Sequence, residues 1–186
     1  MHTQATPAAQ ALTNQAAGAR SLNAAARQLE AMFDNELQLP FALAFQLEAI
    51  NRLLASGAAA NEAADLLGTT ITALLASRTS IQEKRRHIAQ QVVDVCDALP
   101  GDCIELSEQV DPLEDLFDTA MQPFIAVEAT IGEACEALRQ GYTGTAVMRL
   151  TPLENRLRNA TAALDAEHNA IAGYLRNAAS CLPLAQ

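Results

Sequence analysis

The sequence predicts an all-α protein: an elongated antiparallel up-down-up-down four-helix bundle with coiled-coil-like heptad packing and proline kinks. Half of the residues are apolar, and Ala and Leu, which have a high helix propensity, supply most of them. Gly and Pro are scarce, and no segment alternates apolar and polar residues with the period of two that a half-buried strand needs. Three breaks divide the chain into four segments of similar length, and short connections make consecutive helices antiparallel.

The three breaks are turns that contain Gly or Pro. They are Ser56-Gly57-Ala58, Leu99-Pro100-Gly101-Asp102 and Gln140-Gly141-Tyr142-Thr143-Gly144. The predicted helices therefore cover 8–56, 60–99, 102–140 and 145–182, within a single helical-bundle domain of residues 1–186. Residues 1–7 are expected to be disordered because chain ends fray unless they are packed.

Each segment carries apolar residues at alternating steps of four and three, which is the pattern of a coiled-coil seam. In the second segment these residues are Leu67, Ile71, Leu74, Ile81, Ile88, Val92, Val95 and Leu99. Arg78 and Arg85 occupy the two positions of this series where another apolar residue is expected. Glu36 interrupts the seam of the first segment, and Glu167 interrupts that of the fourth.

The prolines predict helix starts at two places and bends at two others. Asp111-Pro112-Leu113-Glu114 and Thr151-Pro152-Leu153-Glu154 each have the order of an N-cap residue, Pro at the first helical position and a capping-box Glu. A short helical piece or a loop would then precede each start. Pro123 lies inside a continuous heptad run and predicts a kink, whereas Pro40 either kinks the first helix or splits it.

Residues that are equally far from a connecting turn face each other in an antiparallel hairpin. This reckoning matches Glu36 with Ser80 and with Arg78, and Glu167 with Arg85. We therefore expect two Arg–Glu pairs in one slice of the bundle. Such pairs can fix the helix register, or their head groups can extend to solvent. A third interpretation is a site for a small anionic ligand, because the planar fork of Arg binds a carboxylate or a phosphate.

The sulfur and imidazole groups indicate no metal centre. Cys96 and Cys103 flank the second turn, and we keep two interpretations for them, a Cys96–Cys103 disulfide or buried thiols. Their spacing is not that of a zinc site, so no metal and no cofactor are predicted. His87 and His168 lack the Glu-x-x-His arrangement of di-iron bundles and are predicted to lie on the surface.

The formal net charge of −10 argues against nucleic acid as a partner, since the phosphate backbone repels an acidic surface. No apolar run is long enough for insertion into a membrane, and the N-terminal residues do not form a Sec signal. We therefore expect a cytoplasmic protein, with secretion by a route that needs no Sec signal as the alternative. No catalytic motif is present, so the chain is not predicted to be an enzyme.

The function predicted from these observations is a non-catalytic interaction or adaptor protein that binds a protein partner or self-associates. Apolar residues outside the seams would either widen the core or supply the interface: Leu66, Leu75, Leu116, Met121 and Ile125. The alternative is a sensor or carrier that holds a small anionic ligand at Arg78, Arg85, Glu36 and Glu167. A weaker alternative is a secreted bacterial effector or a structural component of a virion.

Overall fold

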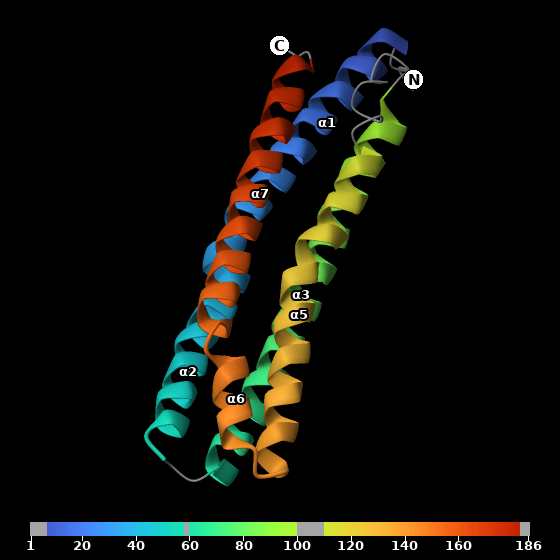
Figure 1. The fold of residues 1–186 in the computed structure, drawn as a ribbon. Helices are drawn as coiled ribbons and strands as arrows, with labels where there is room; N and C mark the ends of the chain where they lie inside the picture. The colour runs from blue at the N-terminus through green and yellow to red at the C-terminus, as the bar shows by residue number, and fades with distance from the viewer. Residues whose placement is uncertain (1–6, 58–59, 100–109, 183–186) are drawn as a thin grey trace. The chain divides into compact units, whose positions relative to one another are not determined.

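The computed structural model of the protein describes residues 7–57, 60–99 and 110–182, and every regular element within these ranges is a helix (Figure 1). The elements are α1 (Pro7–Glu30), the π-helix η1 (Phe33–Leu37), α2 (Gln38–Ala55), α3 (Ala60–Ala98), α5 (Val110–Arg139), α6 (Thr143–Leu150) and α7 (Leu153–Cys181). The predicted all-α class is confirmed for this part of the chain. The predicted helix start at residue 102 lies outside the described residues.

The chain divides into two compact units, each assembled from segments that are far apart in the sequence. The first unit comprises Met1–Met32, Glu83–Phe117 and Ala166–Gln186, and the second comprises Phe33–Gln82 and Asp118–Asp165. The helices α3, α5 and α7 therefore contribute residues to both units. The single domain of residues 1–186 stays a prediction.

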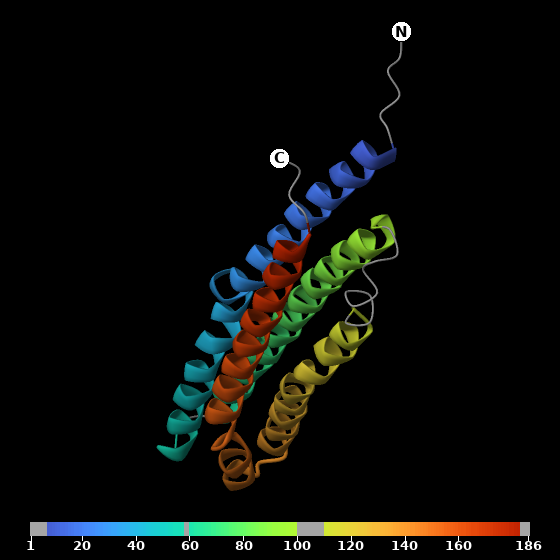
Figure 2. The same ribbon diagram turned by 90° about the horizontal axis from the view of Figure 1, so that it is seen from above.

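The first unit packs α1 against parts of α3 and α7. Its core consists of small and branched apolar side chains, among them Leu22, Ala25, Ala26, Leu29, Ile88, Val92, Val95, Ala172, Leu175 and Ala179. A Cβ atom at Gly18 would lie 3.2 Å from Cγ1 of Val95 and 3.5 Å from Cδ1 of Leu182. Gly18 thus allows α1 to approach both neighbours closely. The helices α1 and α7 lie side by side in both views (Figure 1 and Figure 2), and Arg176 pairs with Glu30 between them.

The second unit has a larger aliphatic core. It is formed by Leu43, Leu47, Ile50 and Leu54 of α2, Leu67, Leu74 and Ile81 of α3, Phe124, Val127, Ile131 and Leu138 of α5, and Leu153, Leu157 and Leu164 of α7. These residues belong to the predicted seams, so their burial agrees with the sequence pattern. The helix α2 also lies against α6, where Asn51 Nδ2 donates to Thr151 Oγ1 at 3.3 Å.

Glycine ends two of the helices at the predicted breaks. Gly57 has φ of 86° and Gly141 has φ of 82°, both in the left-handed region that favours glycine. After α5, the N–H of Tyr142 donates to the carbonyl of Ala137 at 2.8 Å, and the N–H of Gly141 donates to that of Leu138 at 3.0 Å. This pair of hydrogen bonds is a Schellman motif, which satisfies carbonyls that the helix leaves open.

The open question about Pro40 is resolved by the π-helix. The first predicted helix is split at η1, and Pro40 lies in the first turn of α2, where a helix does not need the N–H that proline lacks. In a regular helix that missing N–H would bond to the carbonyl of Glu36, which instead accepts a hydrogen bond at 3.5 Å from Ser77 Oγ. The side chain of Ser77 thus compensates for a donor that proline removes.

Pro123 and Pro152 lie at different places relative to the helices. The helix α5 continues through Pro123, so this residue does not end it, and the kink predicted there stays a prediction. Thr151 and Pro152 separate the short α6 from α7, as the second N-cap signature predicts. The predicted helix 145–182 is therefore two helices, because Pro152 lacks the N–H that would continue the first of them.

Candidate functional site

The buried charges of the first unit centre on Arg85 of α3. This side chain is 1% exposed, and its Nη2 donates to Oε1 of Glu167 on α7 at 2.9 Å. Burial raises the pKa of the Glu167 carboxyl, and the neighbouring Arg85 guanidinium partly opposes that rise. The pairing of Arg85 with Glu167 that the sequence predicts is therefore present.

His168, the next residue of α7, is completely buried, so the predicted surface position of this histidine is wrong. Neither ring nitrogen has a hydrogen-bond partner among the described residues. Burial, and then the nearby charge of Arg85, lower the pKa of the imidazole to about 3. His168 is therefore neutral at physiological pH. His87 on α3 is exposed as predicted.

The error at His168 has a geometric cause. The predicted seam of α7 continues from Leu164 to residues 167, 171, 174 and 178 with a strict seven-residue repeat. The buried row instead passes through Leu164, His168, Ile171, Ala172, Leu175 and Ala179. An α-helix has 3.6 residues per turn, so a strict heptad drifts around its surface. That drift moves residue 168 into the core and leaves Tyr174 and Ala178 half-buried.

In the second unit the predicted pairing of Arg78 with Glu36 is wrong. Nε of Arg78 donates to Oε1 of Glu128 on α5 at 2.8 Å, and Glu128 is buried. Glu36 lies in η1, where its Oε2 accepts a hydrogen bond from Ser80 Oγ at 2.7 Å. Counting residues from the connecting turn thus matched Glu36 with the correct residue, Ser80. It could not show in which direction Glu36 points, because a π-helix rotates its side chains differently from an α-helix.

The four predicted ligand-binding residues are divided between the units, with Arg85 and Glu167 in the first and Arg78 and Glu36 in the second. Each guanidinium already binds a carboxylate of the chain. An anionic ligand would have to displace Glu128 or Glu167 from these contacts. The pair with Glu167 neutralises a buried arginine, and the pair with Arg78 neutralises a buried glutamate, Glu128.

A different feature stands out on the surface of the second unit, on the outward face of α2. Phe41, Phe45, Ala49 and Leu53 follow one another at steps of four residues, and all four are exposed. The three large side chains are 37%, 45% and 44% exposed, respectively. Residues at i, i+4, i+8 and i+12 form one continuous ridge on a helix, and we call these four residues the α2 ridge.

Arg158 of α7 holds the aromatic part of the α2 ridge in place. Its guanidinium carbon lies 4.1 Å from the ring centroid of Phe45 and 5.6 Å from that of Phe41, within the range of a cation–π contact. The two rings contact each other edge to face, with centroids 5.6 Å apart. Arg158 also pairs with Glu154 at 3.3 Å. Arg158 thus contacts both rings, which remain partly exposed to solvent.

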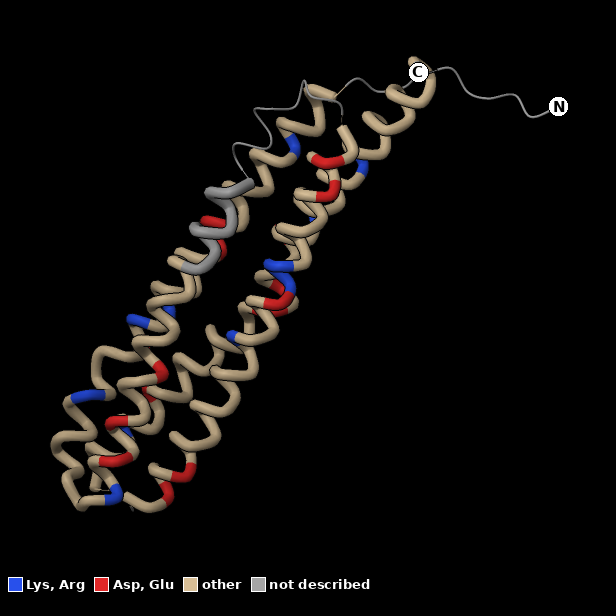
Figure 3. Tube along the Cα trace, turned by 90° about the vertical axis from the view of Figure 1, so that its right-hand side faces the viewer, with Lys and Arg blue, Asp and Glu red and all other residues tan. Residues whose placement is uncertain are grey.

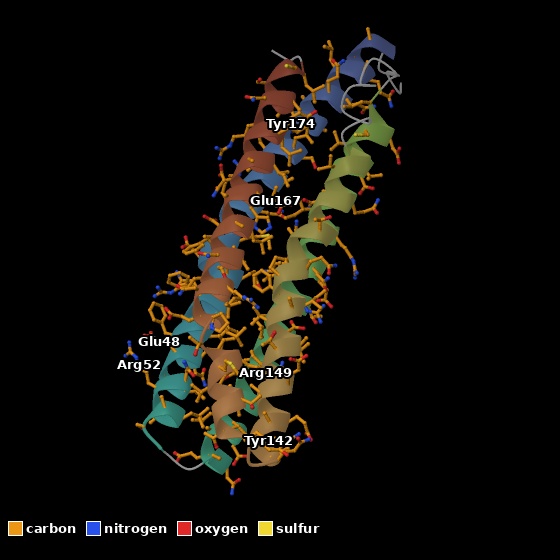
Figure 4. The ribbon with its side chains drawn as sticks, viewed as in Figure 1. Glu48, Arg52, Tyr142, Arg149, Glu167 and Tyr174 are labelled. Atoms are coloured by element: carbon orange, nitrogen blue, oxygen red, sulfur yellow. The ribbon has the colours of Figure 1, made fainter. Side chains whose placement is uncertain are left out.

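The charges beside the α2 ridge are balanced. Glu48 and Arg52 form an ion pair along α2, and both project from the outer side of this helix (Figure 4). Acidic and basic residues are likewise interspersed along the rest of the traced helices (Figure 3). The second unit contains eleven Asp and Glu and six Lys and Arg, so its own net charge is negative although this face is neutral.

The described cysteines differ in their exposure to solvent. Cys135 is buried, which raises the pKa of its thiol, and Cys181 is exposed. Cys103 lies outside the described residues, so the predicted Cys96–Cys103 disulfide stays a prediction. Among the described residues, no three His, Cys, Asp or Glu side chains are grouped in a way that could hold a metal ion. In the same ranges, no helix has both the length and the apolar character that crossing a bilayer requires.

The chain matches no protein-family model, no curated protein and no solved structure.

The α2 ridge was not among the interface residues predicted from the sequence. Of those, Leu75 and Ile125 are exposed, Leu66 is half-buried, Met121 is buried, and the side chain of Leu116 is not described. The step of four from Phe41 to Leu53 was visible in the sequence, next to the seam residues Leu43, Leu47, Ile50 and Leu54. Two apolar rows on one helix predict either a fully buried helix or an interface, and only the structure shows that one row remains uncovered.

Proposed function

We propose that the chain is a non-catalytic interaction protein that docks a helix of a protein partner on the α2 ridge. In this proposal the ridge is presented by an antiparallel up-down-up-down bundle with heptad packing. The observation that carries the proposal is the exposure of three large apolar side chains in one continuous row of α2. Single exposed apolar residues are common, whereas a contiguous apolar patch is typical of a binding surface.

The shape of the surface favours a helix as the docked element. Rows of side chains spaced by four residues pack into the grooves between the corresponding rows of another helix, which is the commonest class of helix packing. The α2 ridge spans three turns and ends at Leu53, just before the helix ends at Ala55. A helical segment crossing these turns would cover both Phe rings and Leu53.

The composition of the surface is that of a binding hot spot. Aromatic side chains and arginine are enriched among residues that dominate binding energy, and Phe41, Phe45 and Arg158 combine both kinds. The contacts among these side chains restrict the rings before a partner arrives. That restriction lowers the entropy cost of binding.

Site-specific photo-crosslinking tests this proposal. A photoreactive phenylalanine analogue replaces Phe45 in the full chain, and in a matched control it replaces Tyr142, an exposed aromatic residue of the same unit outside the ridge. The adducts formed in the expressing cells are mapped by mass spectrometry. We expect the analogue at position 45 to join one discrete helical site, either on another protein or on a second copy of the chain.

The specificity of the adduct is checked with a second substitution. Leu53→Glu, at the other end of the α2 ridge, should abolish the adduct from position 45. If position 45 yields no adduct, or only the scattered products that position 142 also gives, the proposed function is wrong.

A further inference from the structure

The first unit buries an ionisable side chain without compensating it. His168 is completely removed from solvent, and neither Nδ1 nor Nε2 of its ring has a hydrogen-bond partner among the residues whose side chains the structure describes. Buried polar groups normally have such a partner, because burial without one costs free energy. A positive charge on the same ring would cost far more. The core around His168 therefore accommodates the neutral imidazole only.

The buried charges nearest to His168 belong to Arg85 of α3 and Glu167 of α7. The carboxylate of Glu167 already accepts a hydrogen bond from Arg85 Nη2 at 2.9 Å. The other ionisable residues of α3 between positions 83 and 87 are exposed. A proton on His168 would thus place a second positive charge near a guanidinium that already occupies the neighbouring carboxylate. Like charges repel strongly where water is excluded.

Two other helices, α1 and α5, carry carboxylates in the first unit. On α1, Glu30 pairs with Arg176 of α7, both side chains are partly exposed, and the arginines of α1 are exposed. The part of α5 in this unit carries Asp111, Glu114 and Asp115, whose side chains are not described. A carboxylate of this stretch in contact with the imidazole would hold its charged form. The sign of the response to acid therefore tests for such a contact.

The second unit has no corresponding group. All three histidines of the chain, His2, His87 and His168, belong to the first unit. In the second unit the buried charged side chain among those described is Glu128, and Arg78 pairs with it. Histidine is the side chain whose ordinary pKa lies between pH 5 and 8. The buried group that mild acid can charge is thus confined to the first unit within the described part of the chain.

From this placement we infer that the first unit is a pH-sensitive switch: mild acid opens the packing around His168, while the second unit stays folded. In the open unit the imidazole reaches water and binds a proton. In the closed unit burial, and then the charge of Arg85, lower the pKa of His168 to about 3 from its ordinary 6.5. Because the open form binds the proton more readily, acid stabilises it. The switch does not depend on the proposed function, since all of α2 lies in the second unit.

Glu167 limits the size of the response. Burial raises the pKa of its carboxyl, so this group binds a proton more readily in the closed unit and opposes opening at pH values above its ordinary 4.5. One linked proton changes an equilibrium constant by at most about tenfold per pH unit. With the opposing effect of Glu167 included, the opening constant should rise by about tenfold or more between pH 7 and pH 4.

Hydrogen exchange of the purified full chain at pH 7 and pH 4, followed by mass spectrometry of its peptides, tests the switch. The measured rates are divided by the intrinsic amide rates at each pH, which gives the protection of each segment. We expect peptides of α1, and of α7 after residue 166, to lose protection by about tenfold or more in acid. Peptides of α2 and α6, which lie in the second unit, should lose less.

Two variants connect the response to the buried ring. His168→Leu removes the titrating group and should remove most of the acid-induced loss of protection in the first unit. His87→Leu is the matched control, because it removes an exposed histidine of the same unit and should leave the loss unchanged. Circular dichroism at pH 7 verifies that both variants fold.

Three outcomes would overturn the inference. The first is an equal loss of protection in both units, and the second is a first unit that acid protects, as an imidazolium bound to a carboxylate of α5 would require. The third is a loss that His168→Leu retains in full. Crosslinking from position 45 at neutral pH reports on the second unit alone, so its failure and the failure of the switch are distinguishable.

Discussion

Nη2 of Arg85 lies 2.9 Å from Oε1 of Glu167, and the guanidinium that makes this contact is almost completely removed from solvent. The contact joins α3 to α7 in the first unit. A buried arginine without a carboxylate costs several kcal/mol, so the pair is required once Arg85 is in the core.

Glu167→Ala should therefore lower the free energy of unfolding by about 3 kcal/mol, as measured by urea denaturation. The double variant Arg85→Met/Glu167→Ala should recover at least half of this loss, because no charge is then left buried. Glu133→Ala, which breaks the exposed pair with Arg149, is the control and should cost less than about 0.5 kcal/mol. A double variant that is no more stable than Glu167→Ala would contradict this account.

The buried His168 predicts a dependence of stability on pH. The unfolded chain binds a proton at this residue below its ordinary pKa of 6.5, whereas the folded chain binds one only near pH 3. Stability should therefore fall as the pH is lowered from 6.5 to 3, by roughly 1 kcal/mol per pH unit. The raised pKa of Glu167 has the opposite effect above its ordinary value of 4.5, so the fall should be steepest below pH 4.5.

His168→Leu isolates this effect, since it removes the titrating group and two ring nitrogens that lack hydrogen bonds among the described residues. Urea denaturation between pH 3 and pH 7 should give a flatter stability profile for this variant than for the parent. Ile171→Ala, at a buried residue of the same helix that does not titrate, should lower stability by a similar amount at every pH. Equal slopes for the parent and His168→Leu would show that His168 is not the linked group.

Two glycines of the second half of the chain should respond to alanine in opposite directions. Gly141 has φ of 82°, which alanine adopts poorly, so Gly141→Ala should destabilise the protein by about 1 kcal/mol. Gly173 lies within α7, and a Cβ there meets no heavy atom within 4 Å, so Gly173→Ala should stabilise it by roughly 0.5–1 kcal/mol. Thermal unfolding of both variants measures these changes, and a shift of the same sign in both would contradict the helix ends described above.

Much of the fold could be predicted because turn chemistry and apolar spacing are local properties. Gly57 and Gly141 end helices where the sequence places breaks. Most apolar seam residues of the second unit are buried, and Ile71 is half-buried. Distance from the turns was sufficient to match Arg85 with Glu167 and Glu36 with Ser80.

The direction in which a side chain points was harder to predict. His168 lies in the core because α7 has 3.6 residues per turn and so departs from a strict seven-residue repeat. Glu36 does not pair with Arg78 because it lies in a π-helix, which directs its side chains differently from an α-helix. The α2 ridge was missed for a different reason. A row of apolar residues is an interface only if no other helix of the chain covers it, and that depends on the packing of the whole unit.

Photo-crosslinking from position 45 tests the docking of a helix on the α2 ridge most directly. We predict that a photoreactive phenylalanine analogue at position 45 forms one discrete helical adduct, and that Leu53→Glu at the other end of the ridge abolishes it. No adduct, or only the scattered products that the analogue at position 142 also gives, would contradict the docking.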